Sequence, residues 1–344
     1  MKVLHLIQRY PPALGGSETW CREVCRHLAK TAEMKVLTLD VLEEEEFWRD
    51  PPVEQCTIRL GRLDWDGRVL VRRYPRSLPI HSIYHSLLKV VLDGWLQIYF
   101  YGPHSVEMYR RVFSEVRTAD VVHLHTVPYP HNVLGYLAAR FRGKRVVITP
   151  HFHPGHPHYE RWSNYWLLKH CDAVIAVSEY ERNYLASKGI DARRIVTSGN
   201  GVQVEAYRPT DLARFKAELW RAHDLSAHTR AIVFLGRKLE YKGIATLVEA
   251  RKRLQPERDA ALFLAGPREP RHRGALRADR CARASLGVAR EQSGRDHRGH
   301  GAEPLRECLK LLLTDESLRT AMGGKGHAFI CEQDTQARAA ARAR

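Results

Sequence analysis

The sequence predicts an α/β protein in which a parallel sheet is covered on both faces by helices. Short apolar runs alternate with longer helical patterns along most of the chain, which is typical of repeated strand-helix units. A chain of 344 residues also exceeds what one hydrophobic core normally holds, so we expect two domains. In the first domain, the runs expected to form strands are residues 3–7, 36–39, 121–124, 146–148, 173–177 and 195–197.

The helical patterns of the first domain lie between these runs. We expect helices to begin near Ser17, Ser105, Asn132, Glu160 and Ser178. A second unit follows, with strands expected at residues 231–235 and 261–265 and a helix around 246–254. The segment between the units, 200–227, contains a proline and one amphipathic helical pattern near 212–220, which makes it the best candidate for a linker.

The overall charge and the cysteines narrow the class of protein. The formal net charge is +16, which raises the hypothesis of a nucleic-acid or anionic-membrane partner. The basic excess is spread along the chain without the alternation of cations and aromatic residues that single-stranded nucleic acids require, so we expect no nucleic-acid partner. Seven cysteines without a Cys-x-x-Cys pair argue against a disulfide framework or a thiolate zinc site and favour a cytoplasmic location.

No segment of the sequence is expected to span a membrane or to direct export. Residues 1–7 form too short an apolar run for a signal peptide and read as a first strand. The longest apolar stretch, residues 80–101, is interrupted by His81, His85, Lys89 and Asp93, which are costly in a bilayer. Its apolar positions recur at helical spacing, so peripheral contact with the inner face of the membrane stays open, although core packing is favoured.

The residues that follow the predicted strands are the first place to look for a site, because ligands of open α/β sheets bind beyond the carboxyl ends of the strands. After the first strand, Gly15 and Gly16 precede Ser17 and Glu18 at a helix start, where free N–H groups favour an anion. After the strand at 146–148 comes His151. A Gly-Gly turn often only caps a helix, and such a histidine is often structural. The stronger indication of a ligand site is that both features follow predicted strands.

Residues 231–243 carry the most informative single pattern. An apolar, β-branched run ends at Gly236 and is followed by two spaced cations, Arg237 and Lys242. A guanidinium can bind two phosphate oxygens at once, and an ammonium adds a compact second charge. A diphosphate would suit this site, and a solvated basic turn is the alternative.

Six motifs in this chain together resemble glycosyltransferase family 4, the retaining nucleotide-sugar enzymes of the GT-B fold, which has two doubly wound Rossmann-like domains. The motifs lie at residues 15–18, 121–125, 149–154, 173–179, 199–202 and 236–243. The resemblance covers residues 1–267 and resumes at about 303–332. One departure is Gln203, where the family often has an aspartate.

The resemblance implies a UDP- or GDP-linked sugar donor, a glycan or lipid-linked acceptor, and no further cofactor or metal. Arg237 and Lys242 would hold the donor diphosphate, Gly16 would bring its N–H near a phosphate, Glu18 would lie on the acceptor side, and His151 would contact the transferred sugar. Fixed cations suit this reaction because negative charge develops on the leaving diphosphate. The further candidate site residues are Gly15, His125, Asn200 and Gly201.

A metal site is the alternative for the histidine-rich loop that contains His151, His153, His156 and His158, because His-x-His pairs can ligate zinc or copper. Prolines constrain this loop, and no carboxylate or thiolate is close in sequence before Glu160. We therefore expect a solvated or acceptor-facing loop and no metal.

The second domain departs from the family pattern. The resemblance implies two glutamates eight positions apart on a loop-helix junction, and that spacing occurs here only in the wrong places, at Glu46/Glu54, Glu107/Glu115 and Glu249/Glu257. Residues 268–300 contain nine arginines, and no strand is predicted there. An out-of-frame stretch of a GC-rich gene would have this composition, and a basic arm is the alternative.

The predicted organisation has five parts. They are an acceptor-side Rossmann-like domain (1–200), a linker (201–229), the start of an incomplete nucleotide-sugar donor domain (230–267), an atypical arginine-rich segment (268–302), and C-terminal helices with a tail (303–344). The leading hypothesis is a retaining glycosyltransferase of polysaccharide biosynthesis, and the alternative is an inactive, truncated remnant of one. A Rossmann oxidoreductase is disfavoured because the first strand lacks a Gly-x-Gly-x-x-Gly turn.

Overall fold

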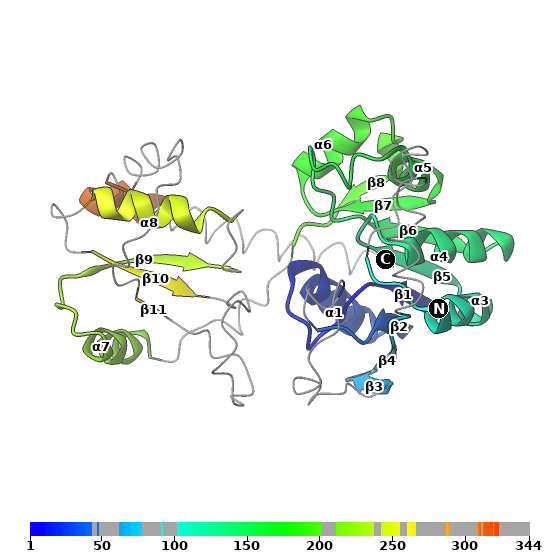
Figure 1. The fold of residues 1–344 in the computed structure, drawn as a ribbon, viewed down its shortest axis with the longest axis horizontal. Coiled ribbons are helices and arrows are strands. Elements are labelled where there is room, and N and C mark those ends of the chain that lie inside the picture. Colours follow the sequence, from blue (N-terminus) through cyan, green and yellow to red (C-terminus); the bar gives the residue numbers. More distant parts are fainter. Residues whose placement is uncertain are drawn as a thin grey trace. The chain divides into compact units, whose positions relative to one another are not determined.

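The computed structural model describes most of the first domain and parts of the second. The described residues are 1–42, 47, 62–77, 91, 102–200, 211–236, 242–254, 260–265, 287–288, 309–310, 312–318 and 320–322. The chain divides into two compact units, Met1–Gly201 and Val202–Arg344 (Figure 1).

The first unit is built on an eight-stranded sheet with the order β3-β4-β2-β1-β5-β6-β7-β8. Its strands are β1 (Lys2–Leu6), β2 (Glu33–Leu39), β3 (Leu63–Asp66), β4 (Val69–Tyr74), β5 (Val121–His125), β6 (Arg145–Thr149), β7 (Ala173–Ala176) and β8 (Ile195–Thr197). All neighbouring strands run parallel except β3 and β4, which form an antiparallel hairpin at one edge. The predicted parallel α/β architecture is confirmed.

The helices of this unit begin within two residues of the predicted positions. They are α1 (Gly16–Leu28), α3 (Val106–Glu115), α4 (Pro130–Phe141), α5 (Trp162–His170) and α6 (Glu179–Ser187), with 3-10 helices η5 (Val116–Thr118) and η6 (Ala192–Arg194). Two of them have serine caps: the Ser105 hydroxyl accepts from the Met108 N–H, and the Ser178 hydroxyl accepts from the Glu181 N–H. These caps satisfy N–H groups that the first helical turn leaves open.

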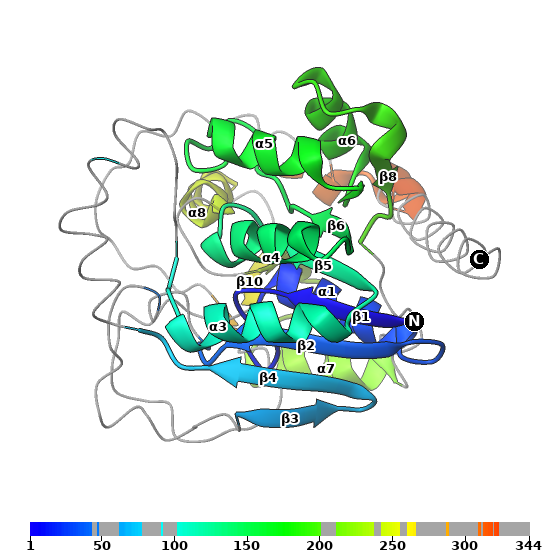
Figure 2. The ribbon, with the colours of Figure 1, turned by 90° about the vertical axis from the view of Figure 1, so that its right-hand side faces the viewer.

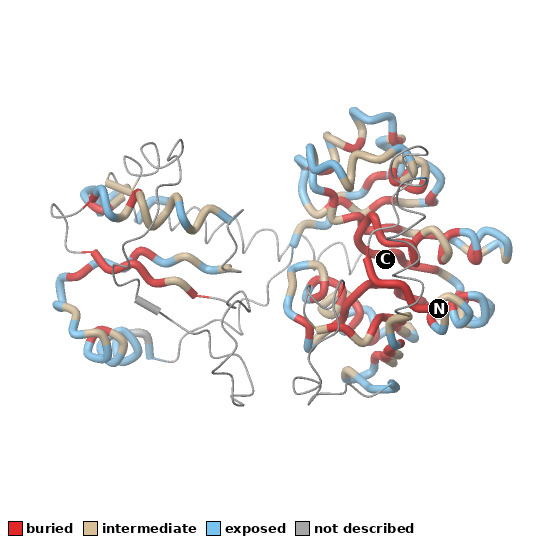
Figure 3. Tube along the Cα trace, viewed as in Figure 1, coloured by how far each residue is buried: buried red, intermediate tan, exposed pale blue. Residues whose placement is uncertain are grey.

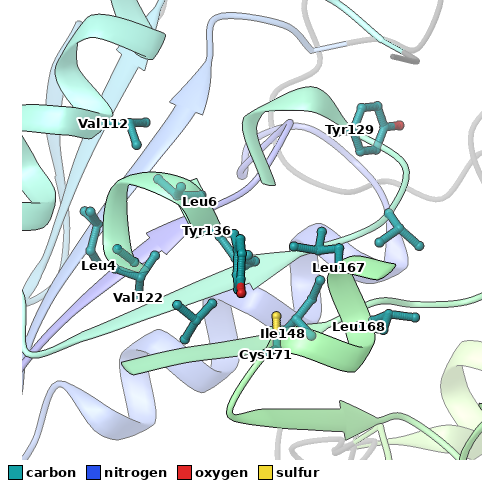
Figure 4. Close-up of a cluster of buried hydrophobic side chains, with 14 of the residues drawn as sticks. Leu4, Leu6, Val112, Val122, Tyr129, Tyr136, Ile148, Leu167, Leu168 and Cys171 are labelled. Carbon is teal, nitrogen blue, oxygen red and sulfur yellow. The ribbon is translucent and has the colours of Figure 1, made fainter. Parts of the chain in front are cut away.

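Helices cover both faces of the sheet, and the central strands are buried between them (Figures 2 and 3). On β1, Leu4 and Leu6 pack into the larger core with α3, α4 and α5, part of which is drawn in Figure 4. Val3 packs into a second core with α1, on the opposite face. Because side chains alternate along a strand, His5 lies on the α1 face, and so do His123 and His125 of β5.

In its described residues, the second unit has a three-stranded sheet with helices on both faces. Its elements are α7 (Leu212–Ala222), β9 (Arg230–Leu235), α8 (Ile244–Arg253), β10 (Ala260–Ala265) and β11 (Gly287–Val288). Trp220 of α7 packs with Ala261 and Phe263, whereas Leu254 packs with Ile232 and Leu262 on the other face. Leu309 and Leu313, in a later helical stretch, pack on the same face as Leu254. The strands predicted at 231–235 and 261–265 are present and pair in parallel.

Two predictions about strands were wrong. Strand β3 was missed because Leu63 and Trp65 are exposed at the sheet edge, and β4 was missed although Val69, Leu70 and Val71 form a short apolar run. The prediction of no strand in residues 268–300 was also wrong, because β11 pairs antiparallel with Phe263 and Leu264 of β10. Backbone pairing at the edge of a sheet needs no apolar run, so the composition of this segment could not reveal β11.

Several sequence-based predictions fall on residues outside the described ranges. These are the apolar stretch 80–101 apart from residue 91, the sites at Arg237 and Gly201, the departure at Gln203, and the glutamates at 46, 54 and 257. Among the residues that the structure describes, no helix combines the length and the apolar character needed to cross a bilayer.

Candidate functional site

Three buried histidines lie under α1 near the carboxyl ends of β1 and β5. The parallel register pairs His5 with His123, and their ring centroids are 5.0 Å apart. The rings of His123 and His125 are 4.1 Å apart, and His123 Nε2 lies 2.8 Å from the Thr149 hydroxyl of β6. Burial first, and then the neighbouring imidazoles, hold the pKa of His123 and His125 well below the ordinary value, so both rings are neutral at physiological pH.

The loops that follow β5 and β6 run together away from this cluster. Thr126 donates its N–H to the Thr149 carbonyl at 2.9 Å, and Val127 donates to the Pro150 carbonyl at 3.1 Å. Asn132 of α4 donates its side-chain amide to the carbonyls of His125 and Thr126, which fixes the turn after β5. Two strand ends therefore carry adjoining, hydrogen-bonded loops, as expected at the ligand-binding edge of such a sheet.

His151 sits in the loop after β6 in a left-handed conformation, with φ of 46°. A residue other than glycine is uncommon in this region, and such residues often occur at functional sites. Burial and, to a smaller extent, His153 lower the pKa of His151 to about 4, so the imidazole is neutral at physiological pH. Its Nε2 is buried and has no hydrogen-bond partner among the described residues. The hydrogen-bonding capacity of this nitrogen is therefore unused within the described part of the chain.

Trp20 of α1 links His151 to a third strand end. The indole ring packs edge-to-face against His151, with centroids 5.5 Å apart, and its N–H donates to the Gly199 carbonyl at 3.2 Å. Gly199 and the exposed Asn200 follow β8. Trp20 therefore brings α1, the loop after β6 and the loop after β8 into one site, although the sequence did not single it out.

The start of α1 gives its two glycines different environments. Glu18 has a side chain only 1% exposed; its Oε1 accepts from Arg9 at 2.8 Å and its Oε2 accepts from Ser17 at 2.8 Å. A Cβ atom on Gly15 would collide with this carboxylate, whereas a Cβ atom on Gly16 would meet nothing within 4 Å. Gly15, the residue before α1, provides no side-chain cap to the helix. The helix N-terminus therefore offers open space at Gly16 and N–H groups suited to an anion.

Glu18 was predicted to lie on the acceptor side of the site. In the structure its carboxylate is bound inside the protein by Arg9, whose guanidinium also lies over the Phe47 ring at 5.3 Å. This ion pair positions the start of α1. The prediction that Glu18 contacts the acceptor stays a prediction.

The histidine-rich loop is organised around Glu160. This carboxylate accepts from the Gly155 N–H at 2.8 Å and from the hydroxyls of Tyr165 and Tyr184, both at 2.5 Å. Burial tends to raise the pKa of Glu160, but the two tyrosine hydrogen bonds outweigh it and lower the pKa. Its oxygens are therefore already used within the protein.

Lys242 belongs to the second unit, in the turn before α8. Gly243, at the N-cap of α8, has a left-handed φ of 76°, and no side chain caps this helix. A cation next to an open helix N-terminus suits an anionic group. The structure thus gathers Gly15, Gly16, Glu18, His125, His151 and Asn200 in the first unit, while Lys242 lies in the second.

The fold defined by these elements is that of GT-B glycosyltransferases. The structure of Anabaena Alr3699/HepE in complex with UDP and glucose matches with a TM-score of 0.52 at 17% identity, covering 77% of this chain and 60% of that one. A glycosyltransferase from Rickettsia africae ESF-5 matches with a TM-score of 0.51 at 18% identity, covering 76% and 59%.

The sequence itself identifies the family. Residues 14–206, more than half of the chain, match Glycosyltransferase Family 4, and the chain belongs to this family. Among its curated relatives is the GDP-mannose:cellobiosyl-diphosphopolyprenol alpha-mannosyltransferase of Xanthomonas oryzae pv. oryzae, which is 26% identical over 216 residues. The same enzyme of Xanthomonas campestris is 26% identical over 218 residues. The match covers 60% of this chain, and the chain spans about half (48%) of the length of each relative.

Proposed function

We propose that this protein binds a nucleotide-diphosphate sugar and transfers the sugar, with retention, to a glycan or lipid-linked acceptor. The observation that carries the proposal is the neutral His151 with its unpartnered Nε2, in a site that Trp20 connects to α1. This site lies within the region that matches the family.

The charge state of His151 suits the proposed role. Positive character develops on the sugar as the glycosyl–phosphate bond breaks, and a protonated imidazole beside it would oppose that change. A neutral imidazole can hydrogen bond to a sugar hydroxyl without this repulsion. At the other end of the bond, Arg237 and Lys242 would stabilise the leaving diphosphate, and the Gly16 N–H would add a neutral donor.

The nucleotide, sugar and acceptor are proposed from chemistry and from relatives. The two Xanthomonas relatives are named for GDP-mannose and for a cellobiosyl-diphosphopolyprenol acceptor, which supports a lipid-linked acceptor. Such an acceptor would place the reaction at the inner face of the membrane, with peripheral contact. Asn200 and Gly201 would complete the surroundings of the sugar, and no further cofactor is needed.

An inactive remnant is the second candidate, and the glutamates favour it. Within the described residues, Glu107 and Glu115 have the family spacing, but they lie together on α3. Glu115 is bound by Lys35 at 2.8 Å and by Arg72 at 2.9 Å, which gives it a structural role. A remnant would keep part of the nucleotide site without the pair of glutamates that the family uses at the donor.

Calorimetric titration of the full chain with UDP and GDP, followed by turnover assays with UDP- and GDP-linked sugars, tests the proposal. Nucleotide binding together with release of nucleotide from a sugar donor supports the transferase. Binding without turnover supports the remnant. If neither nucleotide binds, both candidates are overturned.

A further inference from the structure

A cysteine and two histidines converge inside the first unit, beneath the proposed sugar site. His5, Cys21 and His125 are all fully buried, and one ligand-forming atom from each lies within 4.8 Å of the other two. His5 Nδ1 is 3.0 Å from His125 Nε2, and Cys21 Sγ is 3.7 Å from the same nitrogen. The three side chains come from β1, α1 and β5, so the convergence is a product of the tertiary fold.

Hydrogen bonding alone serves this arrangement poorly. An imidazole nitrogen carries either one proton or one lone pair, so His125 Nε2 can serve only one of its two neighbours at a time. A metal ion instead accepts one lone pair from each of the three atoms. Histidine nitrogen and cysteine sulfur are the ligands that zinc favours in structural sites.

The distances also match a tetrahedral site. Zinc bond lengths of about 2.0–2.1 Å to nitrogen and about 2.3 Å to sulfur place two nitrogens about 3.3 Å apart, a nitrogen and a sulfur about 3.5 Å apart, and two sulfurs about 3.8 Å apart. The observed separations are 3.0 Å between the nitrogens and 3.7 Å from sulfur to nitrogen. Cys25, one turn further along α1, has its Sγ 4.0 Å from Cys21 Sγ.

The charge of the site calls for a fourth, anionic ligand. A zinc ion bound by two neutral imidazoles and one thiolate would leave a net positive charge in the interior, which is costly without compensation. Cys25 is also fully buried, and its thiolate would make the site neutral. Cys25 is not among the three residues whose ligand atoms lie within 4.8 Å of one another, so its side chain would turn toward the ion on binding. We propose that His5, Cys21 and His125 bind a structural zinc ion, with Cys25 as the fourth ligand.

This site goes beyond sugar transfer, because it would fix α1 against β1 and β5 without touching substrate. Helix α1 carries Gly16 at its start and Trp20 against His151. The lack of a Cys-x-x-Cys pair predicted no thiolate zinc site, whereas Cys21 and Cys25 are four apart on one helix face and can still converge on one ion. His125 thereby becomes a metal ligand.

Metal content tests the proposal independently of nucleotide binding or turnover. The full chain would be purified and its zinc measured, then stripped with a chelator and titrated with Co²⁺, which gives a thiolate charge-transfer band when bound by cysteine. We expect one zinc per chain, a cobalt–thiolate band, and a higher Tm with zinc than without. Zinc should also protect the peptide containing Cys21 and Cys25 from alkylation, as mapped by mass spectrometry.

Variants and matched controls separate this site from other cysteines of the chain. Cys21→Ser should lose the bound metal and the cobalt band. Two buried residues of the same kinds in the same unit, changed in Cys171→Ser and His131→Asn, should keep both. If Cys21→Ser does not fold, the cobalt band and the alkylation pattern of the unmutated chain decide. A chain without stoichiometric metal and without the band, or a Cys21→Ser variant that keeps its metal, would overturn the proposal.

Discussion

The carboxylate of Glu18 occupies the space that a side chain on Gly15 would need, because a Cβ atom there would lie 2.0 Å from Glu18 Oε2. Gly15 itself is extended, with φ of 177°, so its backbone does not require glycine. Its small size is what the buried carboxylate requires. Gly16 faces open space instead, and the two glycines of this motif therefore have separate roles.

Replacing each glycine by alanine should separate these roles. In Gly15→Ala the Glu18 carboxylate must move away from Arg9, so we expect a loss of about 1–3 kcal/mol in the free energy of unfolding. Gly16→Ala should change stability by less than about 0.5 kcal/mol, because its Cβ meets no atom. Urea denaturation measures both, and equal losses would contradict this assignment. If phosphate approaches Gly16, UDP or GDP titration should show weaker binding to Gly16→Ala alone.

The Arg9–Glu18 ion pair predicts strong non-additivity. Both side chains are less than one-tenth exposed, so removing one leaves the other charge buried without its partner. Arg9→Met and Glu18→Leu should each cost about 3–5 kcal/mol, while the double variant should cost clearly less than their sum. Urea unfolding of the three variants forms the cycle. Additive losses would mean that the pair does not hold the start of α1.

Asp66 should make stability depend on acidic pH. Burial would raise its pKa, but hydrogen bonds from Arg22 at 2.8 Å, from Arg26 and from Tyr10 outweigh burial and lower the pKa to about 2. A carboxyl whose pKa is lower when folded stabilises the protein above its unfolded pKa of 3.8 and loses this effect as pH falls toward 2.

Asp66→Asn should therefore cost about 1–2 kcal/mol at pH 7 and progressively less between about pH 4 and pH 2. Chemical denaturation across this range measures the difference between the variant and its parent. Asp191→Asn, which removes an exposed pair with Arg193, is the control and should show the smaller effect. A difference that does not change with pH would refute the role of the charged carboxylate.

Local sequence patterns predicted most of the first sheet because each strand needs its own buried, β-branched residues. Helix starts could be placed for the same reason, since caps such as Ser105 and Ser178 act within one turn. The hairpin of β3 and β4 lies at the sheet edge, where β3 exposes Leu63 and Trp65 and therefore gives little apolar signal. Edge pairing hid β11 in the same way.

Some residues of the candidate site could be predicted from local sequence patterns, and others could not. Gly15, Gly16, Glu18 and His151 could be found because the rule that ligands bind beyond strand ends needs only the strand boundaries. Trp20, Arg9, His5 and Cys21 could not, since their roles depend on how α1 packs on β1 and β5. One part of this cluster could have been noticed in the sequence. His123 and His125 are two positions apart at the end of a predicted strand, so both side chains would be expected on the same face of β5.

His151 should act on the sugar and not on the nucleotide. Its left-handed backbone suits glycine, so His151→Gly removes the imidazole without adding strain. We expect UDP and GDP affinities to stay within about twofold. The sugar nucleotide binds more tightly than the free nucleotide by the contribution of its sugar, and this difference in binding free energy should fall by about 0.5–1.5 kcal/mol, the value of one hydrogen bond. Calorimetric titration with nucleotide and sugar nucleotide measures both. Equal loss for the two ligands would reduce His151 to a structural loop residue.

The cations after β9 should bind the diphosphate. Lys242 lies directly before the open N-terminus of α8, where an anion would meet both an ammonium and helix N–H groups. Lys242→Ala and Arg237→Ala should each weaken UDP or GDP binding by about 1.5–3 kcal/mol, as expected for hydrogen bonds to charged groups. Lys252→Ala, at the opposite end of α8, removes an exposed cation of the same type and should leave the affinity unchanged. If all three variants bind alike, the effect of charge is general and the diphosphate does not bind at this turn.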